Sequence, residues 1–191
     1  MKVSGFTFLR NGSLLGYPYL ESIRSALPLC DEFVVAVGES EDDTLERLRA
    51  MNEPKLRLIE TRWNERMQDR GYVYAQQKMI AQFNCDGDWA FYLEGDEVLH
   101  ERDLEAVRSA MRRHLEDRRV EALVFDYHHF FGSPQWLAVG PGCRRSAGSR
   151  TPAPRRGGPR GGAASRSPPP RGRARAAPRR PRGRRPSRRR S

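Results

Sequence analysis

Short apolar runs alternate with helical patterns over most of the chain, and this alternation restricts the fold more than any other feature of the sequence. Runs rich in β-branched and aromatic residues predict strands at residues 3–9, 33–37, 56–59, 89–93 and 121–125. The intervals between them have the apolar spacing of amphipathic helices. This order of elements is typical of an α/β domain in which a mostly parallel sheet carries helices on both faces.

Several of the predicted helices have recognisable ends. Pro18 suits a first helical turn, and Pro28 lies beyond the end of the same segment. Asp42 or Asp43 can cap the second helix. The apolar stripes expected to face the sheet are Leu20, Ile23 and Leu27; Leu45, Leu48 and Met51; Ala75, Met79 and Phe83; and Leu104, Val107, Met111 and Leu115.

The composition changes abruptly at Arg144. From there to Ser191 the chain has 18 arginines, many Pro, Gly and Ala residues, and no acid, Lys, aromatic or large aliphatic residue. The net charge of +11 therefore becomes −7 for residues 1–143. Such a segment cannot bury a core. We expect a folded domain over residues 1–137 and a disordered tail over residues 138–191.

Two explanations of the tail remain open. Arg, Pro, Gly and Ala have the codons richest in G and C, and Lys is missing, so the tail can be an out-of-frame translation of a GC-rich gene. Restored strand patterns in another reading frame after codon 137 would identify a frameshift. The other explanation is an arginine-rich arm that binds RNA or DNA through phosphate contacts and counterion release.

Cysteines and apolar segments indicate the compartment. Cys30, Cys85 and Cys143 are odd in number and lack Cys-x-x-Cys spacing, which argues against a disulfide framework and a zinc site. We expect reduced structural thiols. The chain start is too short and too polar for a signal peptide, and no later stretch suits a transmembrane segment. The sequence therefore predicts a cytoplasmic protein.

Polar residues follow the predicted strands, and parallel strands would bring them to one edge of the sheet. Glu94, Asp96 and Glu97 lie within four residues and repel one another unless solvated, paired or bound to a cation. Asp96 is the best candidate for holding Mn²⁺ or Mg²⁺ together with substrate phosphates. The alternative is a solvated turn before the fourth helix. The other groups at this edge are Arg10-Asn11-Gly12, Gly38 to Asp43, and Asp126 to His129.

Four stretches resemble bacterial family 2 glycosyltransferases: residues 6–11, 27–38, 89–100 and 127–133. The resemblance covers residues 1 to about 136. It implies a Rossmann-like GT-A fold, here truncated, and a nucleotide-diphospho-sugar as donor. It also implies inverting transfer of a hexose without a covalent intermediate, to a glycan, lipid or protein acceptor that the sequence does not identify.

The resemblance also implies roles for individual residues. The Asp-x-Asp signature of the family falls on Glu94-Gly95-Asp96, so Asp96 would bind the metal and Glu94 would lie near the donor ribose or sugar. The nucleotide base would be bordered by Phe8, Arg10, Asn11 and Glu39.

Two departures from the family limit this assignment. The usual Asp-Asp-Gly-Ser sequence after the second strand is replaced by Gly38-Glu39-Ser40-Glu41. The general base of the family is a carboxylate well beyond the fifth strand, and this chain has none after Asp126. The catalytic base is therefore unassigned, and the chain is expected to hold a donor without the complete acceptor half.

Two other functions fit parts of the sequence. A nucleotidyltransferase also joins an α/β sheet to a metal-bound diphosphate, but it needs a glycine-rich phosphate loop after the first strand, where Arg10-Asn11-Gly12-Ser13 has one Gly. A nucleic-acid-binding protein would depend wholly on the tail.

Overall fold

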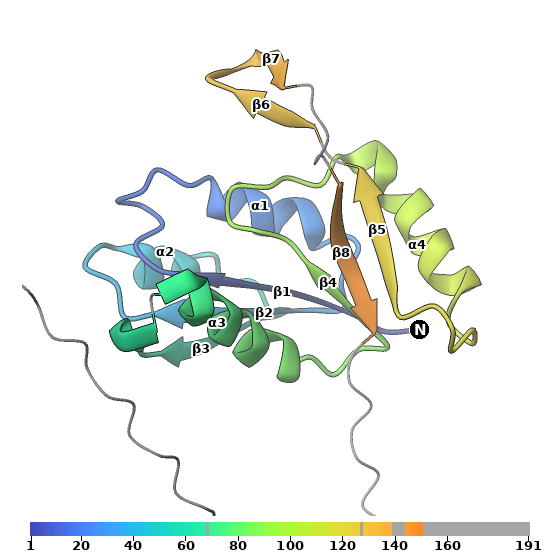
Figure 1. Ribbon diagram of the computed structural model, residues 1–191, viewed down its shortest axis with the longest axis horizontal. Coiled ribbons are helices and arrows are strands. Elements are labelled where there is room, and N and C mark those ends of the chain that lie inside the picture. Colours follow the sequence, from blue (N-terminus) through green and yellow to red (C-terminus); the bar gives the residue numbers. More distant parts are fainter. Residues whose placement is uncertain (68, 127, 139–143, 151–191) are drawn as a thin grey trace, which may run out of the picture. The chain divides into compact units, whose positions relative to one another are not determined.

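The protein is built on a six-stranded sheet of order β3-β2-β1-β4-β8-β5 (Figure 1). The computed structural model describes residues 1–67, 69–126, 128–138 and 144–150. Four neighbouring strands run parallel, which confirms the predicted α/β class with a mostly parallel sheet. The strands are β1 (Val3–Leu9), β2 (Glu32–Gly38), β3 (Leu56–Thr61), β4 (Trp89–Tyr92), β5 (Ala122–Asp126) and β8 (Arg144–Arg150).

Helices cover both faces of the sheet, as the sequence predicted. One face packs against α1 (Tyr19–Ala26), α2 (Thr44–Ala50) and α4 (Leu104–Arg113), whose Ile23, Leu48 and Met111 are fully buried. The other face packs against α3 (Tyr72–Phe83), whose Ala81 joins a second apolar cluster with Phe6 and Ala90. Short 3₁₀ helices span Glu65–Met67, Asp69–Gly71 and Glu101–Asp103.

The face that α3 turns toward the sheet differs from the one we predicted. Its buried positions are Val73, Gln77 and Ala81, whereas Met79 and Phe83 are exposed. Gln77 explains the error, because a polar residue in the buried stripe shifts the apolar pattern to the wrong side. Its side-chain oxygen accepts a hydrogen bond from Thr61 Oγ1 at 2.7 Å, which partly satisfies the buried amide.

The structure adds strands that the sequence did not predict. A separate two-stranded sheet pairs β6 (His129–Phe131) with β7 (Ser133–Ala138). Arg144–Arg150, which we assigned to the tail, forms β8 and pairs antiparallel with both β4 and β5. Ladder hydrogen bonds use backbone groups that every residue except Pro carries, and residues 144–150 contain no Pro. An arginine-rich composition therefore does not prevent strand pairing.

The remaining predictions about the tail and the thiols divide between described and undescribed residues. Cys143 and residues 151–191 lie outside the described residues, and the domain boundary after residue 137 stays a prediction. Cys30 and Cys85 are free thiols, and burial raises the pKa of each to about 12. Within the ranges given above, no helix combines the length and apolar character needed to cross a membrane.

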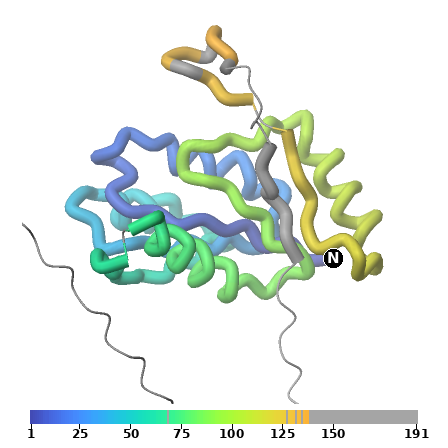
Figure 2. Tube along the Cα trace, in the orientation of Figure 1, coloured from blue at the N-terminus to red at the C-terminus, as the bar shows by residue number. Residues whose placement is uncertain are grey.

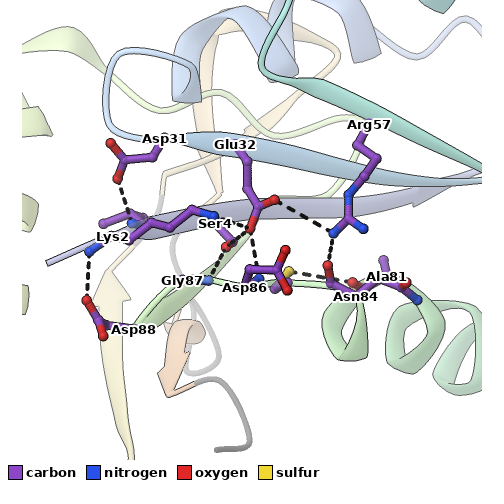
Figure 3. Close-up of polar contacts among 12 residues, drawn as sticks. Lys2, Ser4, Asp31, Glu32, Arg57, Ala81, Asn84, Asp86, Gly87 and Asp88 are labelled. Carbon is purple, nitrogen blue, oxygen red and sulfur yellow. Dashed lines mark hydrogen bonds and ion pairs between the residues drawn. The ribbon is translucent and has the colours of Figure 1, made fainter. Parts of the chain in front are cut away.

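A polar network closes the amino-terminal edge of the sheet around Glu32 (Figure 3). The Glu32 carboxylate accepts hydrogen bonds from Ser4 Oγ at 2.5 Å and from the Asp86 backbone N–H at 2.8 Å. The ammonium of Lys2 lies 3.5 Å away and the guanidinium of Arg57 3.7 Å away. One carboxylate thus joins β1, β2, β3 and the segment that leads into β4.

These partners change the pKa of Glu32. Burial raises the pKa, but the hydrogen bonds from Ser4 and Asp86 and the charges of Lys2 and Arg57 outweigh burial, so the pKa is lowered from 4.5. A carboxyl whose pKa is lower in the folded state stabilises the protein above its unfolded pKa. This stabilisation is lost as the pH falls through the folded pKa.

Replacing Glu32 with Gln is expected to reduce the free energy of unfolding at neutral pH by about 1–3 kcal/mol, because charge-assisted hydrogen bonds are lost. The difference from wild type should shrink as the pH falls below 4.5. Urea denaturation at several pH values measures both effects. Glu21→Gln is the control, since the Glu21 side chain is 62% exposed and its loss should have little effect. A Glu32→Gln deficit that does not change with pH would contradict the assignment.

Candidate functional site

The order of the strands creates a switch point at the carboxyl ends of β1 and β4. From β1 the chain passes through α1 to β2 on one side, and from β3 it passes through α3 to β4 on the other side of β1 (Figure 2). The two crossovers diverge beyond β1, so loops leave room for a ligand at this edge. Phe8 lies near the carboxyl end of β1, and the other predicted site residues follow β1, β2 and β4, so all of them lie at the carboxyl edge.

The acidic turn after β4 is packed directly against the end of β1. A Cβ on Gly95 would lie 2.5 Å from Leu9 Cδ2, so Gly95 allows this close approach. The Glu94 carbonyl accepts a hydrogen bond from Ser22 Oγ of α1 at 2.9 Å, and the Glu94 backbone N–H donates to Glu97 Oε2 at 3.0 Å. These contacts fix the turn at the switch point.

The carboxylate of Asp96 differs from its neighbours in this turn. Glu94 Oε1 accepts a hydrogen bond from Tyr92 Oη at 3.4 Å, and Glu97 caps the turn, whereas Asp96 is exposed. Over the residues that the structure describes, its carboxylate has no hydrogen bond or ion pair. Asp96 is thus the acid of the turn that can bind an external cation.

The loops after β1 and β2 hold each other through side chains. The Asn11 backbone N–H donates to Ser40 Oγ at 3.0 Å, and the Asn11 side-chain oxygen accepts from the Glu41 backbone N–H at 2.8 Å. Asn11 has a φ of 55°, a left-handed conformation that Asn tolerates better than most residues. The Ser13 and Leu14 backbone N–H groups donate to Thr44 Oγ1 and Asp42 Oδ2. This loop therefore offers few backbone donors to a phosphate.

Arg10 and Glu39 meet where these two loops join. Arg10 Nε donates to the Glu39 carbonyl at 3.1 Å, and its guanidinium lies 5.5 Å from the ring centre of Trp63. The Glu39 carboxylate accepts from Arg62 Nε at 2.9 Å, and this hydrogen bond lowers the pKa of Glu39. Glu39 therefore stays ionised and paired with Arg62.

Aromatic rings cover the α3 side of the same edge. Phe8 lies 6.1 Å from Trp63 and 6.3 Å from Tyr74, and Trp63 meets Tyr74 edge to face at 5.5 Å. Trp63 packs on Gly38, where an added Cβ would come within 2.3 Å of its Nε1. Tyr74 remains 54% exposed, so the aromatic surface is open to solvent. A planar base could stack on such a surface.

One lysine of α3 reaches the end of β4. The ammonium of Lys78 lies 3.5 Å from the ring centre of Tyr92, within cation–π distance. The Tyr92 hydroxyl in turn donates to Glu94. Lys78 thus places a positive charge next to the acidic turn, on the side of the aromatic surface.

The donor set of the turn fits a hard divalent ion that is shared with a ligand. Among the described residues, no three His, Cys, Asp or Glu side chains are grouped closely enough to hold a metal. One or two carboxylates completed by phosphate oxygens are usual for Mg²⁺ bound with a diphosphate. Asp96 offers the two oxygens of one exposed carboxylate as ligands, and a second carboxylate, that of Glu94, lies two residues away in the sequence.

A neighbouring pocket of about 490 Å³ lies at the carboxyl ends of β2 and β3. Its charged lining consists of Glu39, Asp42, Glu46, Glu60 and Arg62. Four carboxylates and one guanidinium would repel a diphosphate. At either site a cation would have to offset this repulsion. In the pocket, Glu39 is already paired with Arg62 and Glu60 with Arg49, whereas Asp96 is not paired within the described residues, so the switch point is the better candidate.

The structure gathers the predicted residues into two adjoining groups. Phe8, Arg10, Asn11 and Glu39 form the β1–β2 group, and Glu94 and Asp96 form the β4 group, with Leu9 between them. Their roles toward a ligand stay predictions. The sequence analysis missed Trp63, Tyr74 and Lys78. Trp63 follows β3 at the same edge, so the rule that ligands bind at the carboxyl ends of parallel strands could have found it. The two α3 residues reach the site only through tertiary packing.

No protein-family model and no curated protein matches the sequence. Solved structures do. S. aureus TarS 1-349 is 17% identical, with a TM-score of 0.48 over 79% of this chain and 47% of that chain. The same protein in complex with UDP is 21% identical, with a TM-score of 0.45 over 60% of this chain and 33% of that chain.

A further similar structure is glucosyl-3-phosphoglycerate synthase from Mycobacterium tuberculosis in complex with Mn²⁺, UDP and glucosyl-3-phosphoglycerate. It is 20% identical, with a TM-score of 0.41 over 63% of this chain and 42% of that chain. The chain spans less than half the length of each of these three structures. At these identities and TM-scores, the likeness does not assign an activity.

Gly38→Ala is expected to displace the Trp63 indole and to destabilise the fold by about 1–3 kcal/mol, because the new methyl group overlaps a packed ring. Near-ultraviolet circular dichroism and thermal unfolding measure the two effects. Gly16→Ala is the matched control, because Gly16 has a φ of 68° but no atom within 4 Å of the added Cβ. The control should lose stability without changing the aromatic signal. An unchanged signal in Gly38→Ala would contradict the packing of Trp63 on Gly38.

Proposed function

We propose that residues 1–137 form the donor-binding part of a GT-A-type, family 2-like glycosyltransferase that holds a nucleotide-diphospho-sugar through Mn²⁺ or Mg²⁺. The observation that carries this proposal is the position of the Asp96 carboxylate, which is exposed and has no partner among the described residues. It lies in a turn fixed against β1 at the switch point of a parallel sheet. The resemblance of residues 1 to about 136 to family 2 adds hexosyl transfer with inversion to the proposal. The cytoplasmic location expected from the sequence is also part of it.

Charge balance supports a metal-bridged diphosphate at this edge. Two phosphate groups cannot approach Glu94, Asp96 and Glu97 directly, because like charges repel. A divalent ion on Asp96 converts that repulsion into attraction, as it coordinates phosphate oxygens. Lys78 is placed to neutralise further charge from the α3 side. Phe8, Trp63 and Tyr74 then offer the stacking surface for the base, beside Arg10 and Glu39.

The loop after β1 argues against the nucleotidyltransferase alternative. A phosphate loop needs free backbone N–H groups that converge on the ligand. Here the N–H groups of Asn11, Ser13 and Leu14 donate to side chains of the β2–α2 loop. Recognition of phosphate by a metal and a lysine agrees better with this arrangement.

Donor binding, rather than complete transfer, is the activity that we propose for this chain. Deprotonation of an acceptor hydroxyl needs a positioned base. Asp126 is the last carboxylate of the sequence, and it ends β5. The base and the acceptor surface of a complete enzyme would have to come from other residues.

The test is calorimetry with UDP and Mn²⁺, since UDP is the nucleotide in two of the matched structures. Wild type should bind UDP in a metal-dependent way, and a chelator should abolish most of the affinity. Asp96→Ala should weaken metal-dependent binding on the order of tenfold or more. Asp86→Ala, which removes an exposed carboxylate before β4, should have no effect. Equal binding by wild type and Asp96→Ala would remove Asp96 from the metal site.

Lys78→Met keeps an unbranched apolar stem on Tyr92 but removes the positive charge. We expect UDP affinity to fall about tenfold, because a charge-assisted contact with the diphosphate is lost. Affinity for uridine, which has no phosphate, should not change. The same calorimetric titrations with UDP and with uridine separate the two contributions. A parallel loss of uridine binding would show that Lys78 supports the aromatic surface instead of the phosphates.

A further inference from the structure

The position of Asp96 depends on the backbone of the turn that carries it. Among the described residues the Asp96 carboxylate has no hydrogen bond or ion pair, so no polar partner orients it. A group that binds a ligand generally has to be held within about 0.5 Å of its productive position by packing and supporting hydrogen bonds. The contacts that hold residues 94–99 therefore decide how well Asp96 can bind a cation.

Two serines of α1 hold the two ends of this segment, which passes beside the helix (Figure 1). Ser22 Oγ donates a hydrogen bond to the Glu94 carbonyl at 2.9 Å. Ser25 Oγ accepts a hydrogen bond from the Leu99 backbone N–H at 3.0 Å. The Ser25 hydroxyl donates its own proton to the Ser22 carbonyl at 2.6 Å. Asp96 thus lies between two anchor points on one helix.

Tyr19 adds a third contact on the same side of α1. Tyr19, Ser22 and Ser25 repeat at a spacing of three residues, so they are neighbours along the helix surface. Tyr19 is buried, and its Cβ lies 3.6 Å from the position of a Cβ added to Gly95. The Tyr19 hydroxyl forms a hydrogen bond of 2.9 Å with Ser13 Oγ in the loop after β1. The helix therefore contacts both the acidic turn and the loop that borders it.

The helix that carries these groups is itself fixed in the core. Ile23 and Ala26 are fully buried in the cluster beneath the sheet. Ser22 is 1% exposed, so water does not readily replace its hydroxyl. Removing that hydroxyl takes a donor from the partly buried Glu94 carbonyl, and the turn can regain one only by moving toward solvent.

We propose that Ser22 and Ser25 are positioning residues for Asp96. They hold the acidic turn on α1, so that the carboxylate stays where a divalent ion can join it to a diphosphate. This inference rests on the donor-binding function proposed above and assigns to α1 the support of its metal site. Loss of a hydrogen bond that supports a metal ligand typically lowers metal affinity roughly 10- to 100-fold.

Calorimetry with UDP and Mn²⁺, and with uridine, tests this role in Ser22→Ala, Ser25→Ala and Ser25→Thr. Each alanine variant should bind UDP with Mn²⁺ about tenfold more weakly than wild type. Ser25→Thr keeps the hydroxyl and should bind like wild type. Uridine affinity should not change, because uridine lacks the phosphates that the metal would bind. Ser109→Ala is the matched control, since the Ser109 hydroxyl donates to Glu105 on α4, and it should bind like wild type.

Hydrogen exchange of the backbone amides of residues 94–99 gives a second readout that needs no ligand. Exchange should be faster in both alanine variants than in wild type and in Ser109→Ala. Wild-type affinity for UDP with Mn²⁺ in both alanine variants would overturn the inference. A parallel loss of uridine affinity would also overturn it, in favour of a general loosening of the domain. If wild type itself shows no metal-dependent UDP binding, the proposed function fails, and equal exchange rates would then overturn the anchoring by the serines as well.

Discussion

The pairing of β1 with β2 on one side and β4 on the other is the interaction on which the rest of the structure depends. β1 is buried along nearly its whole length, and its register aligns Leu9 with Val37 and Phe6 with Tyr92. That alignment brings the loops after three strands together, although they are far apart in sequence. The same register places Ser4 beside Glu32, so β1 also organises the polar network at the opposite edge.

Much of this arrangement could be predicted from the sequence, because strands buried on both faces have dense apolar runs. Residues 3–9 were predicted without error, and each end of the other predicted strands lies within two residues of the observed end. The sequence also predicted correctly that Val107 and Met111 lie on the buried face of α4. The carboxyl-edge rule then located the candidate site, because it needs only the order of strands and helices.

The errors arise where tertiary contacts override local pattern. The buried stripe of α3 contains Gln77, which bonds to Thr61 of β3, and no periodicity of apolar residues reveals that contact. Lys78 was missed because its ammonium reaches Tyr92 only once the helix faces the sheet in this orientation. β8 was missed because backbone pairing is independent of composition.

The carboxylates at the two edges of the sheet have opposite surroundings. At the amino edge, Glu32 has two hydrogen-bond donors and two cations, so its charge stabilises the fold by itself. At the carboxyl edge, Glu94, Asp96 and Glu97 crowd into one turn, and among the described residues the Asp96 carboxylate has no hydrogen bond or ion pair. Such crowding raises the free energy of the folded state unless a cation joins it. In the function that we propose, a divalent ion on Asp96 and its anionic ligand would relieve this repulsion.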